Sequence, residues 1–265
     1  MTGAAFDYVE VRRPDLRKPF PRRFGRRLAR QTVLAVSRRA KYLLATLSSS
    51  DTLLIHLGMS GSFRIDPPPA GPVAPGIDEP AEVDLHDHVV FRMSSGATIA
   101  YNDPRRFGVM DLLSPASLEK HPVLSRLGPE PLSAAFDGFA LAQACRGKKT
   151  SLKAALLDQR VVAGLGNIYV SEALHRAGLS PSRRASTIAT SAGAPREHAH
   201  RLTSAIKQVL GEAIARTMSR ASYRSSRFRV YDRAGEPCRR SHCAGVIRRR
   251  TQAGRSTFYC PVCQR

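Results

Sequence analysis

The sequence lacks any long hydrophobic run, and this absence excludes several classes of protein. No stretch approaches the roughly 20 apolar residues that a transmembrane helix needs. The opening residues, MTGAAFDYVEVRRPDLR, have neither the apolar core of a signal peptide nor the Arg- and Ser-rich pattern of a transit peptide. We therefore expect a cytoplasmic protein with no membrane partner.

Acidic residues are also scarce. The chain has 21 Asp and Glu against 42 Lys and Arg, a formal net charge of +21. Solubility asks for much less charge on a protein of this size, so the excess predicts a polyanionic partner. Nucleic acid is the leading candidate because neutralised phosphates release counterions, although a zinc-ribbon RNA-binding or ribosomal protein would show similar charge.

Cysteines are few outside the C-terminal segment, where four of the five lie in the pattern Cys238-x4-Cys243-x16-Cys260-x2-Cys263. In a reducing compartment this spacing predicts one structural Zn²⁺ held by four thiolates rather than disulfides. The intervening VIRRRTQ and RSTFY runs alternate as strands about Ala253 and Gly254, which places Arg255 just past the tip of a hairpin. Cys145 stands alone and is expected in the core.

The distribution of periodic segments predicts an α+β fold in three parts. Residues 1–113 contain short β-branched runs (FDYVEV, TVLAVSRRAKYLLATL, TLLIHLGMSGSFRI, HDHVVFRM and ATIAYN), typical of an antiparallel β-sandwich. The proline-rich stretch 66–82 between them is expected to be an exposed loop. Residues 114–230 carry apolar residues at helical spacing, and residues 231–265 form the zinc finger.

One helical segment, KKTSLKAALLDQRVVAGLGNIYVSEALHRAGLSP, predicts two helices joined by tight turns at Gly164 and Gly166. The first helix ends near Gln159 and the second begins near Asn167. A helix N-terminus binds phosphate through its free amides, so the pair suits a DNA backbone without reading bases. A simple packing hairpin is the alternative.

Eight motifs occur in an order that resembles one family. They are HLGMSG, HDHV, NDPRRFG, LGPEPL, KKTSLK, GLGNIYVSE, GEPC and GRSTFYCPVCQR. From about Val9 to Arg265 the sequence resembles the formamidopyrimidine-DNA glycosylases. The related endonuclease VIII branch is the nearest alternative family. The resemblance implies an N-terminal β-sandwich, a helix-two-turn-helix domain, a C-terminal zinc-finger hairpin and a monomer that binds damaged duplex DNA without a small-molecule cofactor.

The resemblance also implies roles for individual residues. Members of the family extrude a damaged nucleotide, and the hole is filled here by Met59, by Phe107 as a wedge and by Arg105 facing the orphaned cytosine. Further DNA contacts are implied at His86, Lys148, Asn167 and, as a weaker addition, Lys153. Lys41 matches the proton donor of β-elimination. Arg255 matches the δ-elimination residue, where a guanidinium would clamp the departing phosphate rather than lose its proton.

The sequence departs from the family at its start. Members begin with Met-Pro-Glu, whose proline amine attacks C1′ to form a Schiff base, whereas Thr2, Gly3 and Ala4 stand here. The first strand and helix of the sandwich are therefore expected to be missing, through either a start codon placed too late or the decay of a paralogue. The segment TMSRASYRSSRFRVYD is also shorter than the family's loop over the extruded base.

Two functions follow from these observations. The first is a base-excision repair glycosylase with AP lyase activity that removes oxidised purines, 8-oxoguanine and formamidopyrimidines, from duplex DNA. The alternative is a catalytically inactive protein that binds damaged DNA, since the proline and glutamate of the family are not found. An RNA-binding zinc ribbon would leave HLGMSG and DPRRFG unexplained.

Overall fold

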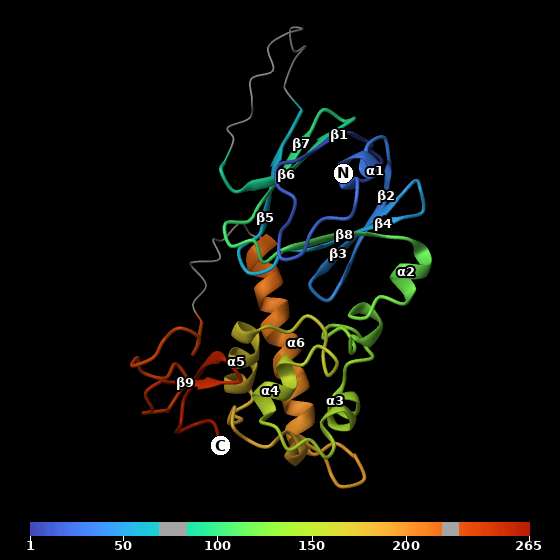
Figure 1. Ribbon diagram of the computed structural model, residues 1–265. Helices are drawn as coiled ribbons and strands as arrows, with labels where there is room; N and C mark the ends of the chain where they lie inside the picture. Colours follow the sequence, from blue (N-terminus) through green and yellow to red (C-terminus); the bar gives the residue numbers. More distant parts are fainter. Residues whose placement is uncertain (69–83, 219–227) are drawn as a thin grey trace. The chain divides into compact units, whose positions relative to one another are not determined.

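The computed structural model describes residues 1–68, 84–218 and 228–265. The chain divides into two compact units, Met1–Ser125 and Arg126–Arg265 (Figure 1). Two sequence expectations, the proline-rich loop and most of the segment TMSRASYRSSRFRVYD, fall largely on residues outside the described ranges. None of the described helices combines the length and the apolar character of a membrane span.

The first unit is built on two four-stranded antiparallel sheets (Figure 1). One sheet has the order β1-β6-β7-β5 and the other the order β2-β3-β4-β8. Their bounds are β1 Phe6–Val11, β2 Val33–Arg39, β3 Tyr42–Leu47, β4 Thr52–His56, β5 Ser62–Asp66, β6 Asp87–Met93, β7 Thr98–Asn102 and β8 Val109–Leu113. A short helix, α1, spans Phe24–Leu28, and α2 spans Pro115–Glu119.

The two sheets share a single apolar core. Phe6 and Phe91, from β1 and β6, are fully buried with ring centroids 5.5 Å apart. Leu53 of β4 and Met110 of β8 belong to the same cluster, so residues of both sheets meet inside. Burial of such side chains contributes about 1.5–3 kcal/mol each, which holds the sheets face to face and confirms the predicted sandwich.

The second unit is helical. Its α-helices are α3 Gly138–Cys145, α4 Leu152–Leu157, α5 Asn167–Arg176 and α6 Glu197–Met218, with a 3₁₀ turn at Ala185–Ile188. Another 3₁₀ turn, Leu124–Arg126, spans the boundary between the units along the chain. Asp137 and Ser151 cap α3 and α4 through side-chain oxygens that accept the amides of Ala140 and Ala154. These caps explain why the two helices begin where they do. Cys145, at the end of α3, is fully buried in the unit's core, as predicted.

The C-terminal hairpin consists of β9, Arg248–Gln252, and β10, Arg255–Tyr259. Ala253 and Gly254 join the strands, and both have positive φ, 48° and 69°. This two-residue turn has the left-handed backbone that favours tight hairpins and confirms the predicted strand reversal. β10 packs against α5 within the second unit (Figure 1).

The sequence prediction missed two details of the first unit. The run 32–47 is not one strand but two, because the chain reverses at Ala40, whose φ is 53°. The helix α1 was not expected, since five residues are too few to show a helical period.

Candidate DNA-lesion site

Two loops of the first unit approach each other closely. One, residues 57–61, follows β4, and the other, residues 103–108, precedes β8. Gly58 has a φ of +69°, and a Cβ atom there would lie 2.5 Å from the carbonyl carbon of Phe107. Only glycine meets both requirements, so the local sequence HLGMSG allows the two loop backbones to touch.

Asp103 connects the same two loops from inside the protein. Its carboxylate, which is fully buried, accepts hydrogen bonds from Ser60 Oγ at 2.7 Å, Gly108 N at 2.8 Å and Tyr101 Oη at 3.1 Å. Burial by itself would raise the pKa of Asp103, but the hydrogen bonds from Ser60, Gly108 and Tyr101 outweigh it and hold the pKa below its ordinary value. The ionised carboxylate therefore braces both loops.

The braced loops present large side chains to solvent. Met59 is 68% exposed and Phe107 is 42% exposed. The Arg105 guanidinium lies over the Phe107 ring, with its carbon 4.8 Å from the ring centroid. The structure thus brings the predicted void-filling residues together on two adjoining loops, although Met59 and Phe107 are the sort of residues usually found in cores.

Two other predicted site residues, His86 and Lys41, belong to the first unit. His86 is half-buried, and its carbonyl accepts the amide of Asp103 at 3.0 Å. Lys41 is exposed in the turn between β2 and β3. Burial lowers the pKa of His56 on the adjacent β4, and the charges of Lys41 and Arg17 lower it further. The lowered pKa favours the neutral form of the His56 imidazole beside the turn that carries Lys41.

In the second unit, the turn between α4 and α5 is held by one side chain. Gln159 donates from Nε2 to the carbonyls of Leu157 and Leu165 at 3.1 and 3.0 Å, and its Oε1 accepts the amide of Gly164 at 2.9 Å. The turn delivers Asn167 to the first position of α5, as predicted. Lys148 is half-buried in the preceding loop, where its carbonyl accepts the amide of Ser186.

Asn167 and Lys153 meet at the hairpin. Asn167 Nδ2 and Lys153 Nζ both donate to the carbonyl of Ser256, at 3.0 and 2.8 Å, and Lys153 Nζ also donates to Thr257 Oγ1 at 2.7 Å. Lys153 is fully buried, and burial followed by the charge of Arg255 lowers its pKa to about 8. The ammonium predicted to contact DNA lies inside the protein, next to the exposed Arg255.

The four C-terminal cysteines form a compact metal-binding group. Their sulfurs all lie within 4.8 Å of one another, with Cys238 and Cys263 at 3.8 Å and Cys243 and Cys260 at 3.6 Å. Zinc–sulfur bonds of about 2.3 Å in a tetrahedron place sulfurs about 3.8 Å apart, so the group fits one structural Zn²⁺. The predicted ligand set agrees with this geometry.

Three buried side chains of this architecture were missed from the sequence. Asp103 lies inside the motif NDPRRFG, where an acid before a proline in a turn was a signal that could have been used. Glu172 of α5, the last residue of the motif GLGNIYVSE, accepts the amides of Arg229, Val230 and Tyr231 at 2.8–2.9 Å. His175 is fully buried beside Cys238, which is distant in sequence.

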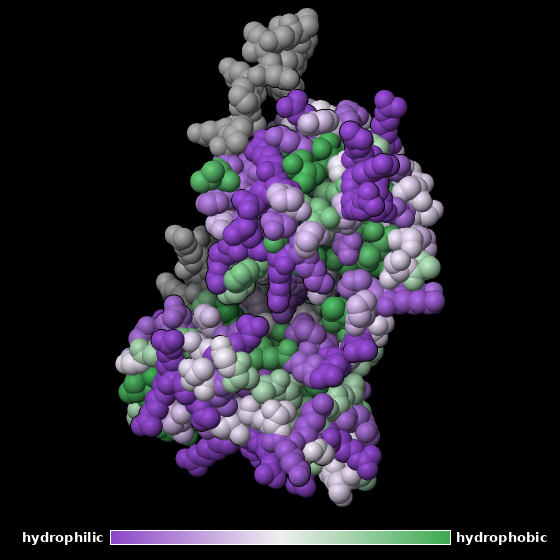
Figure 2. All heavy atoms as spheres, in the orientation of Figure 1, coloured by the Kyte–Doolittle hydropathy of each residue, from purple (hydrophilic) through white to green (hydrophobic). Residues whose placement is uncertain are grey.

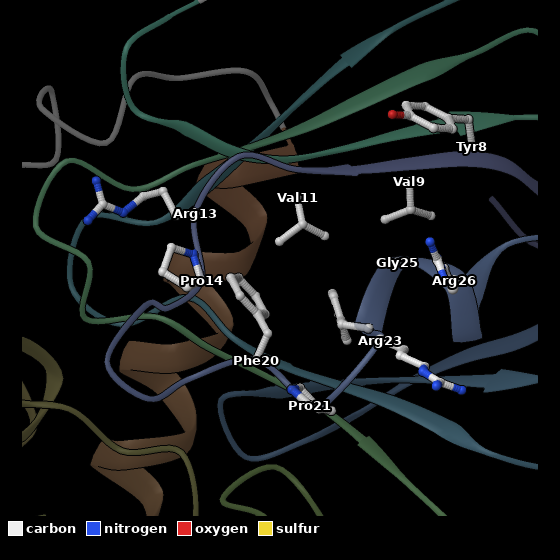
Figure 3. A pocket seen from close by; sticks show the side chains of 11 residues that line it. Tyr8, Val9, Val11, Arg13, Pro14, Phe20, Pro21, Arg23, Gly25 and Arg26 are labelled. Carbon is white, nitrogen blue, oxygen red and sulfur yellow. The ribbon is translucent and has the colours of Figure 1, made fainter.

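A pocket of the first unit lies away from these loops. It has a volume of about 470 Å³ and is formed by β1, α1 and the chain between them (Figure 3). Phe20 and Phe24 stack at its wall, with centroids 5.1 Å apart. It contains none of the predicted site residues, so the loops rather than a cavity define the candidate site. Hydrophilic side chains dominate the visible face of both units, in line with the high charge (Figure 2).

A sandwich with two braced loops, a two-helix turn and a four-cysteine hairpin together define the architecture of a zinc-containing DNA glycosylase. Family models agree along the chain: the formamidopyrimidine-DNA glycosylase N-terminal domain matches residues 1–110, its H2TH domain residues 127–225, and the zinc finger found in FPG and IleRS residues 235–265. The chain belongs to the formamidopyrimidine-DNA glycosylase family.

Individual relatives match this chain over its whole length. The chain is 58% identical to the formamidopyrimidine-DNA glycosylase of Rhodopseudomonas palustris strain BisA53 and 53% identical to that of Azorhizobium caulinodans, covering 100% of this chain and 94% of each relative. A Lactococcus lactis glycosylase complexed with DNA containing FAPY-dG is similar at a TM-score of 0.83 and 29% identity, covering 100% of this chain and 94% of that one. A mutant complex with THF-containing DNA gives a TM-score of 0.84.

Proposed function

We propose that this chain is a base-excision DNA glycosylase with AP lyase activity that removes oxidised purines, 8-oxoguanine and formamidopyrimidines, from duplex DNA. The observation that carries the proposal is the pair of loops braced by Asp103, which exposes Met59, Phe107 and Arg105 together. The relatives named formamidopyrimidine-DNA glycosylase, which are 53–58% identical to this chain, support the same reaction class.

The exposed loop residues suit the hole that base extrusion leaves. Unstacking a nucleotide costs a few kcal/mol, and apolar side chains inserted into the stack offset part of that cost. Met59 and Phe107 supply the apolar surface. Arg105 carries a fixed fork of donors, which matches the acceptor edge of an orphaned cytosine, and the Phe107 ring keeps the guanidinium extended.

The remaining predicted residues suit contacts with the DNA backbone. Asn167 at the start of α5 lies where helix amides favour a phosphate, and Lys148 and His86 add donors from neighbouring loops. Arg255, at the start of β10, would neutralise the departing phosphate, and Lys41 would donate a proton during β-elimination. Lys153 would not contact DNA directly. It would act by holding, through Ser256 and Thr257, the hairpin that carries Arg255.

The three-part division at residues 1–113, 114–230 and 231–265 belongs to the same proposal. The first part would carry the two loops that enter the DNA, the second the helix pair that binds phosphate, and the third the zinc-binding hairpin. Free thiolate ligands for Zn²⁺ suit a reducing compartment, which supports the cytoplasm as the place of action. Fractionation of the native cells, with detection by an antibody, tests the location.

Borohydride trapping tests the activity directly. The chain is incubated with duplexes containing 8-oxoguanine opposite cytosine, or an abasic site, and reduction captures any imine between a protein amine and C1′. We expect a covalent adduct with both duplexes and none with undamaged DNA. Mass spectrometry of the adduct locates the amine, including the α-amine of Thr2 if Met1 is removed.

A matched pair of variants tests the role of the loops. The double variant Met59→Ala, Phe107→Ala should lose most lesion excision, whereas Ile65→Ala, which truncates an apolar side chain on β5 that is 65% exposed, should retain it. Tight binding of the damaged duplex by the unaltered chain, with no adduct and no released base, would contradict the proposed activity.

A further inference from the structure

The C-terminal end of α5 touches the zinc group through a histidine. His175 is fully buried, and its Nε2 lies 3.3 Å from Cys238 Sγ. Its other ring nitrogen, Nδ1, is also buried and has no hydrogen-bond partner among the described residues. The histidine is therefore satisfied on one side only, and that side faces a metal ligand.

The chemistry of the ligand decides which atom donates. A zinc-bound cysteine is a thiolate with no proton of its own, so the ring must supply the hydrogen of this contact. A neutral imidazole carries one N–H, and placing it on Nε2 leaves Nδ1 bare, which agrees with the missing partner at Nδ1. The guanidinium of Arg240 donates to the backbone carbonyls of His175 and Arg176, which ties the end of α5 to the metal segment.

We propose that His175 is a positioning residue of the zinc centre, whose Nε2–H holds the Cys238 thiolate in place and slows loss of the metal. A hydrogen bond withdraws charge from the sulfur, which makes the thiolate less open to protonation and to oxidants. The proposal concerns the metal group and does not depend on the glycosylase activity.

The same helix reaches the hairpin at its other end. Asn167, the first residue of α5, donates to Ser256 on β10, and His175, near its last, donates to Cys238. Gln264, beside the ligand Cys263, donates to the carbonyl of Leu179 just beyond the helix at 2.9 Å. Through these contacts α5 and the metal group support each other, so metal loss is expected to loosen the hold on Asn167.

Zinc release from the full chain tests the proposal without measuring catalysis. The zinc-loaded protein is challenged with hydrogen peroxide, and the released metal is followed with a chromophoric chelator. We expect His175→Phe, which fills the space without a donor, to release zinc about 10-fold faster, in line with losses seen when partners of metal ligands are removed. His175→Gln, whose side-chain N–H reaches the position of Nε2, should restore slow release.

Ser171→Ala provides the control on the same helix. Ser171 is buried, and among the described residues its hydroxyl donates to the carbonyl of Asn167 on the same helix, so this variant should release zinc like the unaltered chain. Equal release rates for His175→Phe and the unaltered chain would overturn the proposal. So would fast release from all three variants, or from both His175 variants, because packing rather than the hydrogen bond would then be responsible.

A measurement on the unaltered chain keeps the proposal testable even if His175→Phe does not fold. Long-range ¹H–¹⁵N correlation spectra of the zinc-loaded protein report which ring nitrogen carries the proton. We expect the Nε2–H tautomer for His175. An Nδ1–H tautomer would refute the assignment, since a bare Nε2 cannot donate to a thiolate.

Discussion

Replacing Asp103 is the sharpest test of how the two loops, residues 57–61 and 103–108, are held in place. Replacement by alanine removes the acceptor of three hydrogen bonds that come from Ser60, Tyr101 and Gly108. The half-buried Ser60 hydroxyl can turn to water, but the Tyr101 hydroxyl and the Gly108 amide remain buried. Each stranded donor costs about 1–3 kcal/mol, so we expect Asp103→Ala to lower the free energy of unfolding by about 3–4 kcal/mol.

The sequence contains no tryptophan, so urea unfolding is best followed by far-UV circular dichroism. Asp103→Asn keeps the shape and one acceptor but loses the charge, and should lie between alanine and the unaltered chain. Asp51→Ala is the control: it breaks an ion pair with Arg27 at 3.1 Å, in which the Arg27 side chain is 42% exposed. Such a pair contributes about 0–1 kcal/mol.

Binding links this stability change to the proposed function. Asp103→Asn should weaken binding to an abasic duplex more than Asp51→Ala does, because the Met59 and Phe107 loops lose their common support. The reasoning is refuted if Asp103→Ala unfolds with no larger loss of free energy than Asp51→Ala.

Three further predictions concern the metal, pH and base recognition. Removing zinc with a chelator, or replacing Cys260 with serine, should abolish duplex binding in a gel shift, because the hairpin loses the ligands that close it. The pKa of Lys153 in the folded chain is about 8, below the roughly 10.4 of an unfolded lysine. Between these two pH values the unfolded state binds more protons than the folded state, so the free energy of unfolding increases with pH. Urea midpoints should therefore rise from about pH 8 to pH 10, and Lys153→Met should lack this rise. Arg105→Ala should reduce discrimination for cytosine opposite the lesion by about 10-fold in single-turnover excision, whereas Arg106→Ala should not; equal effects of the two would argue against a direct contact.

Much of the local structure is determined by patterns in the sequence itself. Alternating apolar residues predict the strands, because side chains on a strand take opposite faces in turn. Ala253 and Gly254 mark the tight turn of the hairpin, and the cysteine spacing defines the metal group before any fold is known. Ordered motifs such as HLGMSG and DPRRFG also identify the family, since each requires specific residues within a few positions of one another.

Only the tertiary structure reveals which distant residues act together. Ser60 and Asp103 are 43 positions apart, His175 and Cys238 63, and Lys153 and Thr257 104, and no local periodicity connects members of these pairs. A lysine at a helix start is usually exposed, so its burial against β10 could not be expected from propensity. Local spacing reports how a segment folds, whereas burial and hydrogen bonding of polar side chains depend on which surfaces the finished chain brings into contact.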